Sequence, residues 1–444
     1  MDKRLICSEA KKARIRETLA NTRQKRSGQV GKVFECKVRT KRLNSRQKEQ
    51  LNRLFLEAKW FYNHVLNMKR NEDIQLRLIN PKYIQKVKHF DKDHNEVESE
   101  LQVLSSHVKQ QMISDMISNS KTIISLIKRG YQKLGGLKFK SEVNYIPLRQ
   151  YNQTYRFKSD HKVKIQGISG ELFIYGTRQF WKSGCEFANA TLLKKPDGYY
   201  IKFTCYFDKD KLPTLKSNGK ELGIDFGCET TLTFSDGEKL QCQIEESDRL
   251  MKLSQRLNRH QTKRSNNRDK TINKIQREYQ KINNKKQEFS NQLYHKMKSY
   301  DKVVIQDEQL SNWKKTGHGK KVQHSCMGTI KTKLKQLPNV VVLNRFIPTT
   351  KLCMKCGTIH REMKLKDRIF ECCGDVLDRD IHAAQNMLDI YHLVDDYLNE
   401  HGLLPSERGE VTLAEFKTAI DERFNYSSTS PNVEARRCQV FSLA

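Results

Sequence analysis

Three acidic positions, far apart in the chain, each follow a short apolar run of the kind found in buried strands. They are Asp225 in Gly223-Ile-Asp-Phe-Gly227, the pair Asp307-Glu308 after Val303-Val-Ile305, and Asp380 in Asp378-Arg-Asp380. Carboxylates that come together from separate strands can hold two Mg²⁺ ions, and two such ions can clamp the in-line hydrolysis of a phosphodiester. The three positions therefore predict a metal-dependent nuclease site made of Asp225, Glu308 and Asp380.

The second acid has an alternative. Side chains alternate along a strand, so Gln306 and Glu308 share one face and Asp307 points to the other. We expect Glu308 to be the ligand if its face carries the other two acids, and Asp307 is the alternative. The third acid, Asp380, begins a predicted helix over 381–388, whose first N–H groups would stabilise a carboxylate there.

Four cysteines between the second and third acids have the spacing of metal ligands. Cys353-x-x-Cys356 lies in a turn-rich segment, and Cys372-Cys373 follows after an interval long enough for a hairpin. Four thiolates give the tetrahedral closure of a structural zinc site, so this segment resembles a zinc ribbon.

The second half of this cysteine set is irregular. Cys372 and Cys373 are adjacent, whereas the usual half-site has two residues between its ligands, so chelation of one ion by both involves strain. Alternatives therefore stay open: His360 or Asp375 supplies a ligand, or the metal has been lost.

The composition indicates a polyanionic partner. The chain has 444 residues, with 83 Lys and Arg against 51 Asp and Glu, which gives a formal net charge of +32. The excess is spread along the sequence, as expected of a large surface for nucleic acid.

No apolar stretch approaches the roughly 20 residues needed to cross a membrane, and a cytoplasmic location is expected. In a reducing cytosol, single cysteines are best interpreted as small buried hydrophobic residues rather than disulfide partners. The eight single cysteines are Cys7, Cys36, Cys185, Cys205, Cys228, Cys242, Cys326 and Cys438.

The N-terminal half alternates between strand and helix patterns. Residues 1–28 are basic without a sustained apolar period, which predicts an arm that orders only on a polyanion, or a disordered tail. A strand is predicted at 30–38, helices at 44–66 and 101–134, and strands over 137–208, which most simply close a barrel with the first strand. Three aromatic residues in the first helix could stack on bases, although a core role is the commoner one: Trp60, Phe61 and Tyr62.

The C-terminal half reads as an α/β layer. A hairpin-like segment over 222–234, with its turn at 235–237, is followed by two basic helices at 246–264 and 267–299. Short continuous apolar strands then flank an amphipathic helix, which is the pattern of a buried mixed sheet. Those strands lie at 303–305 and 340–343, and the helix lies at 323–336.

Together the motifs resemble the TnpB kind of transposon-encoded RNA-guided nuclease and the related compact type V CRISPR effectors. The match lies in three RuvC-like segments, with the cysteine segment between the second and third, and is specific over about 220–390. The segments are Gly223-Ile-Asp-Phe-Gly227, Val303-Val-Ile-Gln-Asp-Glu-Gln-Leu310 and Asp378-Arg-Asp-Ile-His-Ala-Ala-Gln-Asn386. Many members have Glu directly after the second strand, where this chain has Gln306, and an Asn is common where it has His382. If Gln306 occupies that position the site is crippled, unless Glu308 fills the role.

The resemblance implies an α/β and α+β multidomain fold, with an RNase H-like RuvC domain, a zinc-ribbon insertion and a wedge β-barrel interrupted by a helical recognition lobe. The implied segments are a basic arm at 1–28, the barrel at 29–43 and 137–215, the recognition lobe at 44–136, the RuvC-like domain at 216–348 and 376–397, the zinc-ribbon-like target-binding module at 349–375 and a tail at 398–444.

The function implied is that of a Mg²⁺-dependent endonuclease that binds a structured guide RNA, reads a short motif beside its target and cuts double-stranded DNA. Two Mg²⁺ ions and one structural Zn²⁺ are the implied cofactors. The resemblance leaves open whether the chain acts alone or as a homodimer. Two alternatives remain: an unguided RNase H-like transposase or resolvase, and a guided DNA-binding repressor whose nuclease site has decayed.

Overall fold

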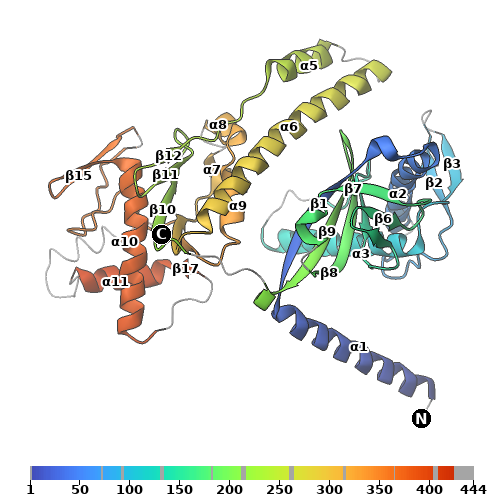
Figure 1. Cartoon of the computed structure of the whole chain (residues 1–444), viewed down its shortest axis with the longest axis horizontal. Helices are drawn as coiled ribbons and strands as arrows, with labels where there is room; N and C mark the ends of the chain where they lie inside the picture. The colour runs from blue at the N-terminus through green and yellow to red at the C-terminus, as the bar shows by residue number, and fades with distance from the viewer. Residues whose placement is uncertain are drawn as a thin grey trace. The chain divides into compact units, whose positions relative to one another are not determined.

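The computed structural model describes residues 3–71, 74–91, 95–130, 135–181, 184–211, 217–259, 265–313, 317–364, 366–403 and 409–424. The chain forms two compact units, Met1–Pro213 and Thr214–Ala444 (Figure 1). Each is described by itself. The first contains an antiparallel sheet with helices, and the second a mixed sheet with helices on both faces. The predicted multidomain combination of α+β and α/β parts is therefore confirmed.

A seven-stranded antiparallel sheet forms the first unit. Its strands are β1 (Gln29–Val38), β4 (Tyr145–Leu148), β5 (Tyr155–Ser159), β6 (Lys162–Ile165), β7 (Leu172–Tyr175), β8 (Glu186–Lys195) and β9 (Gly198–Asp208). Their order is β4-β8-β9-β1-β7-β6-β5, so the N-terminal strand lies in the middle, between β9 and β7. As predicted, the first strand joins strands from much later in the chain, and β8 and β9 form a hairpin.

The two edge strands of this sheet, β4 and β5, are consecutive in the chain. A flat sheet would hold them about 29 Å apart, whereas the six residues between them reach about 24 Å even when fully extended. The sheet must therefore curve, and it nearly closes on itself. Across the described residues no ladder joins β4 to β5, so the predicted barrel is left open at this seam.

Helices α2 (Ser45–Asn71) and α3 (Ser106–Lys128) lie between β1 and β4 in the chain, where helices were predicted. Trp60, Phe61 and Tyr62 of α2 are 9%, 0% and 5% exposed, so the core role holds and base stacking by these rings is excluded in this structure. The hairpin of β2 (Lys86–Phe90) and β3 (Glu96–Glu100) was not predicted, because its charged residues alternate without an apolar run.

The N-terminal arm differs from its prediction. Residues Lys3–Ser27 form helix α1 rather than a segment without regular structure. The arm is rich in Ala, Leu, Arg, Lys, Gln and Glu, which are the residues of highest helix propensity, although it lacks a pronounced apolar face.

A six-stranded sheet forms the second unit, in the order β12-β11-β10-β13-β14-β17. The strands are β10 (Glu221–Phe226), β11 (Leu232–Phe234), β12 (Lys239–Leu240), β13 (Lys302–Gln306), β14 (Val340–Leu343) and β17 (Glu410–Val411). The four strands from β10 to β17 in this order are parallel, and β11 and β12 pair antiparallel at one edge. The turn at 235–237 joins β11 to β12, so it lies one strand later than its place in the predicted hairpin.

Helices cover both faces of this sheet. One face packs on α6 (Asn266–Met297), α8 (Gly319–His324) and α9 (Met327–Leu334), and the other packs on α10 (Arg379–Glu400) and α11 (Leu413–Arg423). Helix α5 (Asp248–Arg259) lies beside the far end of the long helix α6 (Figure 1). This confirms the two helices predicted at 246–264 and 267–299 and the predicted α/β layer.

Part of the predicted C-terminal tail is instead integral to this unit. Strand β17 extends the sheet beside β14, and Phe416, Ala419 and Ile420 of α11 are buried against α10. The segment was overlooked because β17 has only two residues, too few for a periodic signal. Residues 427–444 of the predicted tail lie outside the described residues.

Two of the single cysteines are paired, contrary to expectation. Cys242 and Cys326 form a disulfide with their Cα atoms 6.1 Å apart. An antiparallel backbone bridge between their neighbours, Gln243 and Ser325, brings the two cysteines together. The sequence separation of 84 residues gave no sign of this contact. Along the part of the chain that the structure describes, no helix is both long enough and apolar enough to cross a membrane.

Candidate active site and metal centre

Asp225 lies on the face of β10 that is covered by α10. The alternate residues Leu222, Ile224 and Phe226 belong to the core on the opposite face, so the odd-numbered positions point toward α10. The helix approaches this strand very closely, because a Cβ added at Gly223 would lie 1.9 Å from the Ala384 carbonyl oxygen. Glycine at 223 is therefore what allows α10 to pack beside Asp225.

Asp380 occupies the first turn of α10. Asp378 is the N-cap, and its Oδ1 accepts hydrogen bonds from the N–H groups of Asp380 (3.0 Å) and Ile381 (3.2 Å). The Arg379 guanidinium donates to Asp380 Oδ1 at 2.9 Å. The cap fixes the start of the helix, and the arginine partly neutralises the carboxylate, a neighbour that the motif Asp378-Arg-Asp380 already contained.

The side chains of Asp307 and Glu308 lie in different surroundings. Asp307 forms ion pairs with Lys331 of α9 (2.8 Å) and with Lys335, the C-cap of that helix (2.6 Å), on the opposite face from α10. Burial would raise the pKa of Asp307, but these two lysines hold it below its usual value. Within the described residues, Glu308 makes no such ion pair, and it lies close enough to Asp225 to influence its ionisation.

The three predicted acids form one electrostatic cluster. Burial raises the pKa of Asp225 well above its usual range, and the carboxylates of Asp380 and Glu308 raise it further. Burial also raises the pKa of Glu308. Clustered carboxylates of this kind repel one another, and a divalent cation would relieve that repulsion. Their oxygen donors suit Mg²⁺, so the residues fit the predicted metal.

Gln306 holds the position beside Asp225. Ile224 pairs with Ile305 in the parallel ladder, so the next residues, Asp225 and Gln306, are neighbours on the α10 face. The Gln306 amide donates to the carbonyls of Asn344 (3.2 Å) and Ile347 (2.7 Å). Thr349 Oγ1 donates to its Oε1 at 3.0 Å. Both the nitrogen and the oxygen of the Gln306 side-chain amide are thus hydrogen-bonded to protein groups.

The alternation that was expected to place Gln306 and Glu308 on one face stops at Gln306. Strand β13 ends there, and the Glu308 N–H donates to the Gln306 carbonyl at 2.9 Å, which turns the chain. The strand therefore does not continue through Glu308, although Glu308 lies near Asp225 and Asp307 pairs with lysines on the opposite side.

A second buried polar group joins α10 to the cysteine segment. Asn386 Nδ2 donates to the carbonyls of Thr349 and Leu352, each at 2.7 Å. His382 Nε2 lies 3.0 Å from the Leu352 carbonyl, and its ring stacks on Phe370 with centroids 3.5 Å apart. Burial lowers the pKa of His382. Sequence reasoning had no means to find these partners, because they come from three separate segments.

The four predicted cysteines come together. The Sγ atoms of Cys353, Cys356, Cys372 and Cys373 all lie within 4.8 Å of one another. Three of the distances are 4.0 Å (Cys353 to Cys373), 3.7 Å (Cys356 to Cys372) and 3.7 Å (Cys372 to Cys373). Four sulfurs bound tetrahedrally to zinc at about 2.3 Å are about 3.8 Å apart, so the cluster fits this ion.

Backbone turns explain how adjacent cysteines can share one ion. Strands β15 (Ile369–Cys372) and β16 (Asp375–Asp378) pair with a two-residue turn, in which Cys373 and Gly374 have φ of +53° and +83°. Positive φ at both positions is the geometry of a type I′ hairpin turn. In the first half, the Gly357 N–H donates to the Cys353 carbonyl at 2.8 Å.

Hydrogen bonding prepares one thiol of the cluster as a ligand. Although burial opposes ionisation, contacts with Thr358 and with the neighbouring thiols lower the pKa of Cys356 to about 6. Of the alternative ligands, Asp375 pairs with Lys355 at 2.7 Å, and His360 packs edge-on against Phe370. Neither belongs to the group of four that the structure brings together.

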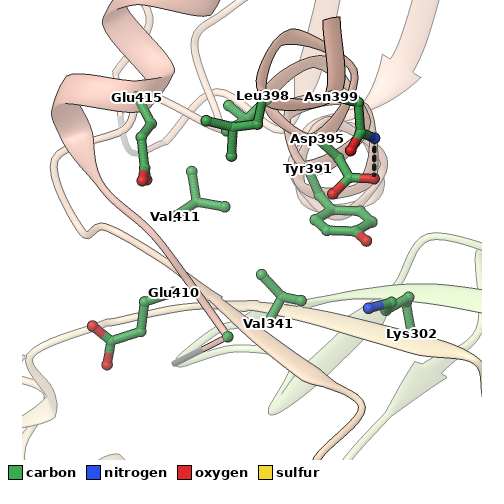
Figure 2. Close-up of a pocket in the computed structure, with 11 residues that line it drawn as sticks. Lys302, Val341, Tyr391, Asp395, Leu398, Asn399, Glu410, Val411 and Glu415 are labelled. Carbon is green, nitrogen blue, oxygen red and sulfur yellow. Dashed lines mark hydrogen bonds between the residues drawn. The ribbon is translucent and has the colours of Figure 1, made fainter. Parts of the chain in front are cut away.

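Two cavities of about 350 Å³ lie in this unit. One lies between α10, β17 and α11, with Tyr391, Asp395 and Asn399 on one side and Lys302 and Val341 on the other (Figure 2). It contains none of the three acids. The other is lined by Glu308, Gln309, Asn312, Trp313, Arg345 and Phe346, and so it adjoins the acid cluster.

Two protein families match parts of this chain. Residues 203–316, which include Asp225 and Glu308, match a family described as "Probable transposase" (OrfB_IS605). Residues 327–387, which include Asp380 and the four cysteines, match a "Cas12f1-like, TNB domain" family. These parts of the chain are similar to that transposase family and to Cas12f1-like TNB domains. The resemblance predicted from the motifs is thus confirmed for these residues.

Individual proteins to which this chain is similar include a curated protein of Streptomyces pristinaespiralis described as a "Putative RNA-guided DNA endonuclease". It is 28% identical over 220 residues, which are 46% of this chain and 53% of that protein, so the match spans about half the length of the relative. A solved Cas12f1–sgRNA–target DNA complex covers 81% of this chain and 99% of its own, with 12% identity and a TM-score of 0.42.

Proposed function

We propose that this TnpB-like protein is an RNA-guided DNA endonuclease with a RuvC-like, RNase H-like catalytic domain. The observation that carries the proposal is the electrostatic coupling of Asp225, on the face of β10 covered by α10, with Asp380 and Glu308. Asp225 and Glu308 lie in residues that match a transposase family, and Asp380 lies in residues that match a Cas12f1-like TNB domain. The curated relative described as an RNA-guided DNA endonuclease supports the guided activity. The partners proposed are a structured guide RNA and double-stranded target DNA.

The three acids are proposed to hold two Mg²⁺ ions. When bound, these would activate water and stabilise the leaving 3′ oxygen of the phosphodiester. Asp225 and Asp380 would supply ligands from rigid positions, one on a central strand and the other on a capped helix. Arg379 restrains the Asp380 carboxylate before the ions arrive, and Lys331 and Lys335 hold Asp307 away from the site.

The cysteine cluster is proposed to be a structural zinc site of the zinc-ribbon kind, within a module that contacts target nucleic acid. Strand β16 of its hairpin runs directly into α10, so an ion on Cys372 and Cys373 would fix the strand that leads to Asp380. The near-closed sheet of the first unit would be the wedge, and α2 and α3 the recognition lobe.

The test is to purify the protein from cells that carry its native locus, sequence the RNA that remains bound and challenge the complex with a plasmid library of randomised target-adjacent sequences. A single abundant RNA with a fixed and a variable part, together with Mg²⁺-dependent cutting beside one short motif, is expected. Asp225→Asn should abolish cutting and spare RNA binding. Asp236→Asn, an exposed acid in the next turn, should cut normally. Persistent cutting by Asp225→Asn would overturn the site assignment.

A second candidate is a guided DNA-binding repressor without nuclease activity. The observation that favours it is Gln306, an amide directly beside Asp225 at the position where many relatives carry Glu. The same complex distinguishes the two, because a repressor binds its target and leaves it intact. Mass measurement of that complex reports whether one chain or a homodimer binds each RNA.

A further inference from the structure

The turn Asn344–Ile347 displays an exposed aromatic ring beside the acid cluster. Phe346 has 55% of its side-chain area exposed. The turn is internally bonded: the Phe346 N–H donates to Asn344 Oδ1 at 3.0 Å, and the Ile347 N–H donates to the Asn344 carbonyl at 3.1 Å. Single exposed apolar residues are ordinary on protein surfaces. This one differs in being held by a defined turn.

Gln306 anchors the turn to the catalytic strand. Its amide N–H groups donate to the carbonyls of Asn344 and Ile347, the first and last residues of the turn. On the other side, the Asn344 N–H donates to the Val411 carbonyl at 3.0 Å. A carboxylate at 306 has no N–H to donate to either carbonyl. The amide therefore has a role of its own, which is to fix Phe346 relative to Glu308.

The hollow next to this turn combines three kinds of group. Its lining includes the Glu308 carboxylate, the Phe346 ring and the Arg345 guanidinium, in a volume of about 350 Å³. Arg345 Cζ lies 4.8 Å from the centroid of the Phe346 ring. Within the described residues, Arg345 makes no ion pair, so its charge is available to a ligand. An aromatic face with an unpaired cation is how proteins bind unpaired nucleotides, by stacking and by phosphate contact.

We propose that this hollow binds one unpaired nucleotide of single-stranded DNA, with its base against Phe346 and its phosphate near Arg345. The bound nucleotide lies next to the phosphodiester at Glu308, and Phe346 positions the strand for cutting. Gln306 is a positioning residue that acts through the turn. The inference rests on the proposed function, since it names the substrate state that the same site takes.

The experiment measures binding without cutting. In an Asp225→Asn background, full-length protein is titrated with a short single-stranded DNA that carries 2-aminopurine at one position, and the position is moved along the strand. One position should show quenching by stacking. Adding Phe346→Ala should weaken binding by about tenfold and remove that quenching. Phe346→Trp should retain both, and Phe346→Leu should lose the quenching although it preserves apolar volume.

Leu403→Ala is the matched control, since Leu403 is similarly exposed at 50% in the same unit. It should bind as the parent does. An abasic nucleotide at the quenched position should weaken DNA binding by the parent and leave DNA binding by Phe346→Ala unchanged. Gln306→Glu should reproduce part of the Phe346→Ala loss, and thermal unfolding of each variant confirms that it folds.

Equal binding by Phe346→Ala and its parent, or quenching that persists in it, would overturn the proposal. Equal, Phe346-dependent binding of single-stranded RNA of the same sequence would overturn the assignment to DNA. Because no cutting is scored, failure here is distinguishable from failure of the proposed endonuclease: an active nuclease with an indifferent Phe346 refutes only this inference.

Discussion

Replacing Gly223 by Ala should damage the catalytic unit, because an added Cβ meets a closer backbone atom there than at Gly227 or Gly409 of the same unit. The new Cβ would lie 1.9 Å from the Ala384 carbonyl oxygen and 2.9 Å from its carbon. Both are backbone atoms in the middle of α10, so no side-chain rotation can relieve the clash. An ordinary van der Waals contact begins at 3.4 Å, so the Cβ and the carbonyl oxygen must move apart by about 1.5 Å.

Overpacking of this kind costs about 1 to 3 kcal/mol, and at a backbone contact we expect the upper end of that range. The effect on cutting should be larger. Asp380 is carried by α10 and Asp225 by β10, so the displacement separates two of the three acids, and a misplacement of about 1 Å can cost about 100-fold in rate.

Urea unfolding measures the stability, and the rate of target cutting at saturating Mg²⁺ measures the geometry. Gly328→Ala in α9 is the matched control. Its Cβ would meet only Leu310 Cδ1, at 3.9 Å, so this change should be neutral or stabilising by up to about 1 kcal/mol. Normal cutting by Gly223→Ala would refute the idea that close packing of α10 on β10 sets the acid geometry.

Further predictions concern charge, metal and the first unit. Because the pKa of Asp225 is raised in the folded state, ionisation opposes folding, and its cost appears as pH rises above the unfolded value of about 4. In chemical unfolding without metal, Asp225→Asn should thus have a higher free energy of unfolding than the parent at pH 7 and the same one below pH 4. Added Mg²⁺ should narrow the difference in unfolding free energy at pH 7. The Glu57 carboxylate is 0% exposed and accepts hydrogen bonds from the backbone N–H groups of Gln102, Val103 and Leu104. Glu57→Ala should therefore lower the free energy of unfolding, measured in urea, by about 3 kcal/mol or more. The control Glu49→Ala, at an exposed position, should leave it almost unchanged. Elemental analysis should find one zinc ion per chain. Cys353→Ser should lose this ion, and the control Cys228→Ser should keep it. Zinc that remains bound to Cys353→Ser would contradict the four-sulfur site.

Sequence reasoning succeeded where the signal is local. The apolar runs of β13 and β14 and the periodic stripe of α2 each specify their own element, and the spacing of the four cysteines specified their meeting. What lies beyond a local pattern was not predicted. The hydrogen bonds of Gln306 come from residues 38 and 41 positions later, so its role as a turn anchor is invisible in the segment around it.

Conformation at single residues set another limit. Adjacent cysteines implied a strained half-site, because the sequence does not reveal that Cys373 adopts positive φ in a two-residue turn. Likewise, the expected alternation from Gln306 to Glu308 assumed a strand that continues, whereas β13 ends at Gln306. These are choices of a few backbone angles, which composition and periodicity do not determine.

The central place of β1 in the first unit has a consequence for synthesis of the protein. Gln29 pairs with Asp208, 179 residues later, so the middle strand of this sheet emerges from the ribosome long before its partner β9 exists. At about 5 to 20 residues per second, the strand waits roughly 10 to 35 seconds with both edges unsatisfied. During that interval α2 and α3 can form locally, but the sheet cannot. The nascent N-terminal half is thus exposed to misassembly for most of its own translation, and its yield should depend on what shields β1 meanwhile.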